Sequence, residues 1–439
     1  MKKIKVYFHT LGCKVNQYDT QLMIENLLLD ERFEITREMD KADVFVVNTC
    51  VVTEKAEKES KKLIRKFSSK GKVVVTGCLP EKEFPSYSNI PYLKLRDEKN
   101  IRNVILSLFG ESESSLSYRK NITRFYGRTR AFVKVQEGCD RFCSYCIVAY
   151  LRGKPRSRNP EEILREIRNL ISNGYREIVL TGTQIGLYGY GEDKNLASLI
   201  REILKIPSDF RIRISSINPE FIDNSLIEIM KEGRVCPHLH LSLQSGSDRI
   251  LRLMRRQYTI AEFLEKVERF KREVKNATVT TDIIVGFPGE EEEDFKSTLE
   301  AVRKAGFIRV HIFPYSKRKG TLAANFKNEV PEDVIKERER ILNEVVREVV
   351  KNEIGKFLGK RLIVLNEKAK SGYTENYIRV KLDKPVKMNQ FYIVYLQSIK
   401  NSVVYGKIEK EFSYSSIEKG GETSKCPQLK EEKEKTSIA

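Results

Sequence analysis

Residues 138–146 read Gly-Cys-Asp-Arg-Phe-Cys-Ser-Tyr-Cys, so Cys139, Cys143 and Cys146 follow one another with the spacing C-x3-C-x2-C. Three thiolates this close can hold one metal centre. A structural zinc site needs four ligands, and none of the four histidines lies nearby in sequence. Three cysteines on a [4Fe–4S] cube leave one iron open for chemistry on a bound molecule. A zinc knuckle that borrows a distant fourth ligand is the alternative.

The cysteine stretch follows the first of six strand patterns that alternate with helical patterns. Asn159 and Pro160 together form a good helix start. Six successive βα units predict an open (β/α)6 barrel, TIM-like, with its functional loops at the carboxyl ends of the strands. The strand patterns cover 131–135, 177–181, 211–215, 238–243, 278–285 and 308–313, and the helical ones 160–172, 196–204, 223–231, 248–254, 259–274 and 291–304.

The first hundred residues form a second α/β unit. Strand patterns at 5–10, 42–48 and 73–76 alternate with helical patterns at 19–29 and 54–69. Such alternation predicts a Rossmann-like parallel sheet. We therefore expect an amino-terminal domain over 1–112, a Ser-rich and charged linker over 113–126, and the barrel over 127–355.

The carboxy-terminal part changes character after a long helical pattern at 332–357. Short strand patterns follow at 361–365, 377–382, 391–396 and 403–408. They predict a small antiparallel β-barrel within residues 356–417. The polar tail 418–439 is expected to be disordered.

Composition limits the partners and the compartment. The 439 residues contain 80 Lys and Arg against 61 Asp and Glu, a net charge of +19, which favours a polyanion such as nucleic acid. No apolar run is long enough to cross a bilayer, so we expect a cytoplasmic protein with no membrane partner. Eight cysteines in such a chain do not indicate a disulfide framework. Cys236 is expected in the core and Cys426 without a role.

Three further cysteines each follow a predicted strand of the amino-terminal sheet. Cys13, Cys50 and Cys78 lie within about three residues of the strand ends. Because the carboxyl ends of parallel strands share one edge of a sheet, the three can converge on one point. The alternative is three small buried side chains, since free cysteine packs well.

The cysteine stretch resembles the cluster motif of the radical S-adenosylmethionine (SAM) superfamily, in which an aromatic residue such as Tyr145 commonly precedes the third cysteine. The resemblance implies that Cys139, Cys143 and Cys146 bind a [4Fe–4S] cluster whose open iron chelates SAM. It also implies that the reduced cluster cleaves SAM to a 5′-deoxyadenosyl radical, with the barrel positioning the cofactor. An electron-donor protein is then required.

Residues 10–19, 48–52 and 76–78 are similar to the amino-terminal domain of the methylthiotransferases. In that family Cys13, Cys50 and Cys78 would bind a second [4Fe–4S] cluster, which handles the transferred sulfur. The last strands resemble the RNA-binding TRAM domain. The sulfur donor is not identified by the sequence.

The resemblance continues in the loops after the barrel strands. These residues imply contacts with SAM, although tight barrel turns are the alternative explanation for each of them. Two positions depart from the family pattern, Asn218 and Ala149, and neither removes a cysteine. The residues assigned to SAM are Tyr145, Gly182, Thr183, Ser215, Ser216, Gln244, Asp282 and Ile284.

Family members differ in substrate. The sequence of residues 13–16 most resembles that of the branch acting on N6-threonylcarbamoyladenosine (t6A) in tRNA. The implied reaction removes hydrogen from C2 of t6A in the anticodon loop and installs a methylthio group, using two SAM molecules. One alternative is a methylthiotransferase that acts on isopentenyladenosine of tRNA or on a ribosomal protein. A second alternative is a non-catalytic metal-containing RNA-binding protein. Basic residues are expected to bind the phosphates of the anticodon stem-loop; the alternative is that they form only a solvated basic face. They are Arg128, Arg130, Arg152, Arg156, Arg158, Lys317, Arg318 and Arg379.

Overall fold

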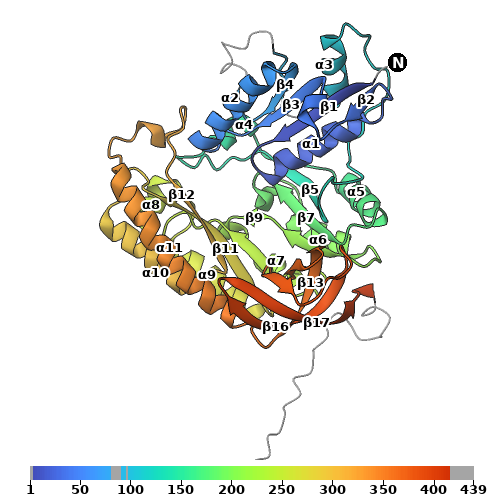
Figure 1. The fold of residues 1–439 in the computed structure, drawn as a ribbon. Coiled ribbons are helices and arrows are strands. Elements are labelled where there is room, and N and C mark those ends of the chain that lie inside the picture. Colours follow the sequence, from blue (N-terminus) through green and yellow to red (C-terminus); the bar gives the residue numbers. More distant parts are fainter. Residues whose placement is uncertain (1–2, 81–89, 95–96, 416–439) are drawn as a thin grey trace, which may run out of the picture.

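A parallel sheet with strand order β2-β1-β3-β4 forms the amino-terminal domain (Figure 1). The structure is a computed structural model that describes residues 3–80, 90–94 and 97–415. Alternate residues of the fully buried strand β3 face opposite layers: Val44 and Val46 pack with α1 and α3, and Phe45 and Val47 with α2. The predicted Rossmann-like sheet is confirmed. The elements are β1 (Ile4–Thr10), α1 (Lys14–Leu27), β2 (Phe33–Ile35), β3 (Val44–Thr49), α2 (Glu54–Ser68), β4 (Lys72–Gly77) and α3 (Ile101–Leu108).

The sequence did not predict β2, which has only three residues, and it placed the start of α1 five residues too late. The helix begins at Lys14, so Cys13 is its N-cap residue. This early start brings the positive end of the helix dipole beside the first cysteine.

The central barrel is open and contains the six predicted βα units. Strands β8 and β9 are two parts of one interrupted strand. Parallel strands follow one another in the order β5-β7-β8 on one side of this interruption and β9-β10-β11-β12 on the other. The short strand β6 pairs antiparallel with β5 at one edge, and within the described residues no pairing joins β5 or β6 to β12. The strands are β5 (Arg130–Glu137), β6 (Arg156–Ser157), β7 (Glu177–Gly182), β8 (Arg211–Ile214), β9 (Ser216–Ile217), β10 (His238–Leu241), β11 (Thr278–Val285) and β12 (Arg309–Pro314).

Helices cover the outside of the barrel (Figure 1). Their apolar faces join the strands in one large core, which Ile163, Ile200, Phe263 and Phe295 represent. They are α5 (Pro160–Ser172), α6 (Leu196–Leu204), α7 (Asn224–Ile229), α8 (Asp248–Leu253), α9 (Ile260–Glu273), α10 (Glu292–Ala305) and α11 (Glu332–Gly355). The short helix α4 (Val148–Arg152) instead packs through Leu151 against the core of the amino-terminal domain.

The carboxy-terminal strands close into a five-stranded barrel, as predicted, with two differences. The sequence missed β14, because its Gly372 reads as a turn residue. A Cβ there would lie 2.1 Å from the carbonyl oxygen of Leu365, so this strand needs a glycine. The pair β15–β17 is parallel, whereas the other pairs are antiparallel. The strands are β13 (Arg361–Lys368), β14 (Ser371–Thr374), β15 (Arg379–Leu382), β16 (Phe391–Lys400) and β17 (Val403–Phe412).

The turn between β14 and β15 plugs the amino-terminal end of the central barrel. Arg211 donates a hydrogen bond to the Tyr373 carbonyl at 3.0 Å, and Arg213 donates to the Thr374 carbonyl at 3.2 Å. The Tyr377 ring stacks on His238 with centroids 4.5 Å apart. The small barrel therefore closes the end of the central barrel opposite to the predicted cysteine loop.

The segment predicted as a linker, 113–126, is partly packed into the molecule. Ile122 and Phe125 are buried in the core of the central barrel, and the backbone N–H of Thr123 donates to the Glu25 carboxylate at 2.7 Å. Cys236 is buried, as expected. The predictions for Cys426 and for the tail 418–439 lie outside the described residues. No described helix has the length and apolar character to span a membrane.

Candidate active site

The loop that carries Cys139, Cys143 and Cys146 lies between β5 and α4. It begins at Gly138, whose φ of +83° and whose close approach to the Lys154 carbonyl leave no room for a side chain. The backbone N–H of Cys139 donates to the Gly153 carbonyl at 2.9 Å. These contacts fix the loop at the carboxyl end of the first barrel strand, where the sequence placed it.

A guanidinium group lies beside the middle cysteine of this loop. Arg256 Nη1 is 3.6 Å from Cys143 Sγ, and Arg256 Nη2 donates to Asn218 Oδ1 at 3.0 Å. Asn218 is one of the two positions that the sequence analysis expected to differ from the family pattern, and its side chain accepts this hydrogen bond from Arg256. Sequence reasoning missed Arg256, because it follows Cys143 by 113 residues.

The structure brings Cys13, Cys50 and Cys78 together at one edge of the amino-terminal sheet. Their thiols are close enough to interact electrostatically. A Cβ on Gly12 would lie 2.9 Å from Cys50 Sγ, and Gly77, with φ of +95°, packs against Asn48 and Thr49. The two glycines therefore make room for three sulfur atoms around one point.

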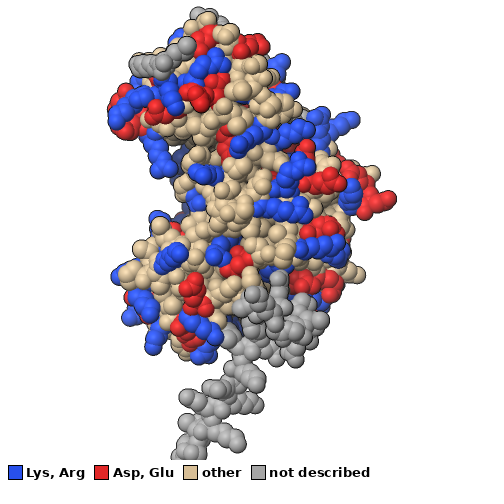
Figure 2. Space-filling view, turned by 90° about the vertical axis from the view of Figure 1, so that its right-hand side faces the viewer, with Lys and Arg blue, Asp and Glu red and all other residues tan. Residues whose placement is uncertain are grey.

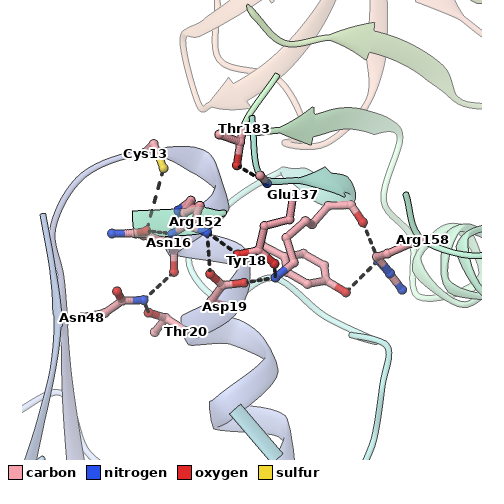
Figure 3. Close-up of polar contacts among 12 residues, drawn as sticks. Cys13, Asn16, Tyr18, Asp19, Thr20, Asn48, Glu137, Arg152, Arg158 and Thr183 are labelled. Carbon is pink, nitrogen blue, oxygen red and sulfur yellow. Dashed lines mark hydrogen bonds and ion pairs between the residues drawn. The ribbon is translucent and has the colours of Figure 1, made fainter. Parts of the chain in front are cut away.

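Asn16 and Arg152 lie beside the cysteines of the amino-terminal domain, and Figure 3 shows both residues near Cys13. Asn16 Oδ1 is 3.9 Å from Cys13 Sγ and 4.0 Å from Cys78 Sγ. Arg152, on α4 directly after the barrel cysteines, donates to Asn16 Oδ1 at 2.5 Å and approaches Cys78 Sγ at 3.8 Å. The barrel thus contributes a cation to the cysteines of the other domain.

The cysteine thiols are ligands that an iron–sulfur cluster takes, and each group lies beside a guanidinium group. Among the described residues no three His, Cys, Asp or Glu side chains converge tightly enough for one metal ion. A cube of iron and sulfide is larger and holds its thiolates further apart, and an anionic cluster matches Arg152 and Arg256. Burial raises the pKa of Cys78 to about 11 and of Cys146 to about 12, so metal binding must displace their protons.

The residues in the loops after β5 and β7 that were predicted to bind SAM make contacts with other parts of the protein. Thr183 Oγ1 accepts a hydrogen bond from the Gly138 N–H at 3.2 Å, which anchors the start of the cysteine loop (Figure 3). Gly182 packs directly against Gln136. Tyr145 lies in a buried cluster with Ile284 and its phenol pKa is raised by burial. A tight barrel turn, which was the alternative to a contact with SAM, is therefore sufficient to explain the glycine at position 182.

Other predicted SAM residues lie along the inner strands. Ser215 is buried, Ser216 is exposed, and Gln244 adopts a φ of +68° while pairing with Ile283. Asp282 pairs with His240, with Nε2 and Oδ2 3.0 Å apart. His240 also forms a hydrogen bond with the Thr280 hydroxyl. Sequence reasoning missed these interactions of His240 because it considered the histidines only as metal ligands and excluded them. A cavity of about 380 Å3 lies elsewhere, between the amino-terminal end of the barrel and the small barrel.

Four of the residues predicted to bind RNA are buried or half-buried and are held in ion pairs, and their contact with RNA stays a prediction. Arg152 pairs with Glu137, Arg158 with Glu166, Arg130 with Glu367, and Arg318 with Glu57. In each case the carboxylate comes from a position that tertiary folding brings close. The remaining four are exposed, although Lys317 also pairs with Glu329; they are Arg128, Arg156, Lys317 and Arg379.

Exposed basic side chains spread over one face of the molecule. Figure 2 shows them over both the amino-terminal domain and the parts below it, interspersed with acidic residues. The outline is indented at the left edge, and basic side chains lie at the indentation. This distribution suits a long polyanion better than a small anionic ligand.

Comparisons with known proteins agree with this geometry. Residues 133–302 match the family described as Radical SAM superfamily, and residues 5–92 match the uncharacterized protein family UPF0004. The chain is 41% identical, over 82% of its length and 86% of the relative, to the threonylcarbamoyladenosine tRNA methylthiotransferase MtaB of Chlamydia pneumoniae. It is 36% identical to the protein of the same name from Bacillus subtilis, over 85% of this chain and 89% of that one.

The chain is also similar to a relative named for another tRNA nucleoside and to a solved structure. The tRNA-2-methylthio-N(6)-dimethylallyladenosine synthase of Bacillus anthracis is 34% identical over 84% of this chain and 79% of that protein. Among solved structures, the radical SAM methyltransferase TsrM from Kitasatospora setae matches with a TM-score of 0.52 and 14% identity, covering 71% of this chain and 75% of that one. At that identity the likeness concerns the fold alone.

Proposed function

Because this chain belongs to the radical SAM methylthiotransferase family, we propose that it converts t6A at position 37 of tRNA to its 2-methylthio derivative. Family membership implies a [4Fe–4S] cluster and SAM. The finer assignment to t6A rests on the relatives named as threonylcarbamoyladenosine enzymes, which reach 41% identity. The RNA-binding resemblance of the small barrel and the net charge of +19 support an RNA substrate. A tRNA substrate places the reaction in the cytoplasm.

The observation that carries the proposal is the presence of two cysteine groups, with Arg152, from the helix that follows the barrel cysteines, lying 3.8 Å from Cys78 of the other group. Cys139, Cys143 and Cys146 would hold the cluster that binds SAM, and Cys13, Cys50 and Cys78 would hold the second. When bound, the two clusters supply the one-electron cleavage of SAM and the sulfur that is transferred. The protein's own part is to keep both groups at one reaction chamber and to hold each thiol triplet beside a cation.

Turnover under anaerobic conditions tests this function. The purified holoprotein receives SAM, a reductant and tRNA that is unmodified, carries t6A or carries isopentenyladenosine, and the nucleosides are identified by mass spectrometry. Methylthio-t6A is the expected product. Methylthiolation of isopentenyladenosine alone, or of a ribosomal protein, would refute the substrate assignment.

Iron and sulfide counts test the number of clusters separately. About eight irons per chain are expected for two cubes, and about four for one. Cys50→Ala should reduce the count by about half and abolish the product, while SAM cleavage continues. The matched control is Cys236→Ala, which removes a buried thiol outside both groups and should keep the full iron count.

A further inference from the structure

Strand β12 forms one edge of the open barrel, and its inner face is exposed. Within the described residues it pairs only with β11. Alternate residues of a strand point to opposite faces, and Val310 and Ile312 pack into the core beneath the outer helices. The residues on the other face, which is the inner face of the barrel, are Arg309, His311 and Phe313. All three are exposed, and 40% of Phe313 is accessible to solvent.

The neighbours of Phe313 on the inner face are polar or were predicted to contact SAM. The strand register places Asp282 of β11 beside His311, and Ile284 beside Phe313. Asp282 pairs with His240 of β10, with Nε2 and Oδ2 3.0 Å apart. The rings of His240 and His311 follow, with centroids 6.1 Å apart. Phe313 therefore places a large apolar ring at the end of a polar row inside the barrel.

The end of β12 contacts both parts of the protein that carry cysteines. Tyr315 packs against the same buried cluster as Tyr145 of the barrel cysteine loop. Ser316 Oγ accepts a hydrogen bond at 2.8 Å from the backbone N–H of Glu54, the first residue of α2. This helix follows the loop of Cys50 in the amino-terminal domain. The exposed ring on β12 thus lies within a few residues of contacts with both cysteine-bearing parts.

The ring of Phe313 is also arranged for stacking. It lies nearly parallel to the ring of His311, at an interplanar angle of 20° and with the centroids 6.5 Å apart. A single exposed apolar side chain is common on any protein and needs no explanation by itself. A phenylalanine that is exposed inside the barrel, beside another flat ring, offers its face to a planar molecule that enters there.

We propose that Phe313 stacks on the adenine ring of the target nucleoside and so holds it in the barrel between the two cysteine groups. This inference rests on the proposed function and deepens it. Unstacked bases of RNA loops are held by stacking on aromatic side chains, because every base has a π-face. Stacking covers the face of adenine and leaves its edge free, and C2 with its hydrogen lies on that edge. The reacting atom therefore stays accessible while the ring is immobilised.

SAM brings a second adenine into the barrel, and the position of Phe313 favours the RNA base. A small molecule buries most of its surface in the pocket that binds it. Strand β12 is instead an edge strand whose inner residues are all exposed. The loop of a large RNA can reach such an open edge with a base that has left its stack.

The experiment measures binding rather than turnover. Holoprotein with Phe313 and with Phe313→Ala is titrated, without reductant, with an anticodon stem-loop that carries either t6A or an abasic site at position 37. Stacking of one base on an aromatic ring accounts for a factor of about five to 150 in affinity. We expect Phe313→Ala to weaken binding of the t6A stem-loop by that factor and to leave binding of the abasic stem-loop unchanged.

Three further variants separate stacking from damage. Phe109→Ala removes a phenylalanine of similar exposure, 37%, whose ring lies beside Lys72 at the end of β4 opposite to Cys78, and should bind both RNAs as the parent protein does. Phe313→Tyr keeps the ring and should retain the affinity for t6A RNA. Phe313→Leu keeps apolar bulk without a ring and should lose most of it. Iron content and tRNA-independent SAM cleavage should match the parent in all variants.

The outcomes distinguish the inference from the proposed function. If the parent protein does not methylthiolate t6A at all, the proposed function fails. If it does, and Phe313→Ala binds both stem-loops as the parent does or weakens both equally, only the inference fails. Loss of SAM cleavage with unchanged RNA binding would assign the ring to the adenine of SAM and would also overturn the inference. Where Phe313→Ala does not fold, equal affinities of Phe313→Tyr and Phe313→Leu for the t6A stem-loop contradict a stacking role.

Discussion

Arg152 approaches Cys78 to 3.8 Å although the two residues are 74 positions apart and belong to different domains. The same guanidinium group donates to Asn16 Oδ1 at 2.5 Å and to Glu137 Oε1 at 2.7 Å. Its side chain is nearly inaccessible to solvent, so its charge acts on the cysteine group rather than on solvent ions. The loop carrying one set of cysteines thus controls the surroundings of the other set.

Replacing Arg152 should weaken the second cysteine group selectively. Arg152→Gln removes the cation beside Cys78 and leaves Glu137 without this partner. Changes to groups that support metal ligands typically cost about 10–100-fold in affinity or activity. We expect product formation to fall in that range, with SAM cleavage retained. Activity, iron content and SAM cleavage are measured together. Arg168→Gln, which replaces an exposed arginine on α5 outside the predicted RNA contacts, is the matched control; equal loss in both variants would contradict the prediction.

Glu177 should be essential for attachment of the small barrel. Burial alone would raise its pKa, but Arg213 and Arg211 hold it below the usual range, so it is ionised and bridges both guanidinium groups. Removing one partner of a buried ion pair costs about 3–5 kcal/mol because the remaining charge is uncompensated. Glu177→Gln should therefore lower the free energy of unfolding by that order in a urea titration. Glu202→Gln, whose carboxylate pairs with Lys205 at the surface, should change it little.

Stability should also depend on pH through Glu375. Burial raises the pKa of Glu375 from 4.5 to about 7 in the folded protein. The folded state therefore holds a proton that the unfolded chain has released, and the contribution of Glu375 to stability falls as the pH rises from about 4.5 to 7. Glu375→Gln should raise the melting temperature at pH 8 and change it little near pH 5. A gain of equal size at both pH values would show that Glu375 does not titrate in this way.

RNA binding should distinguish exposed arginines from buried ones. If Arg156 contacts a phosphate, Arg156→Gln reduces the slope of log K against log salt by about 0.9. Arg158, which bonds with Glu166 and Tyr18, should instead affect folding when it is replaced by Gln. Filter binding of tRNA across a salt series measures the slope, and thermal melting measures folding. A reduced slope for Arg158→Gln without any loss of stability would contradict this division.

Local sequence was sufficient for the parts of the protein that depend on short-range pattern. Strand and helix periodicity predicted the three folded parts, and the C-x3-C-x2-C spacing placed Cys139, Cys143 and Cys146 in one loop. Cys13, Cys50 and Cys78 were expected at one sheet edge because parallel strands end on the same side. The short strands β2 and β14 were missed, since three or four residues carry too little periodicity.

Tertiary structure alone decided which charges are available and what surrounds the cysteines. Arg152, Arg158, Arg130 and Arg318 look in sequence like members of basic runs, yet each pairs with a carboxylate of another structural element, which for Arg130 and Arg318 lies more than 200 residues away in the sequence. The insertion of Tyr377 into the end of the barrel likewise depends on contact with His238, 139 positions earlier. An ion pair or a ring contact requires two groups within a few ångströms, and sequence order does not encode that distance.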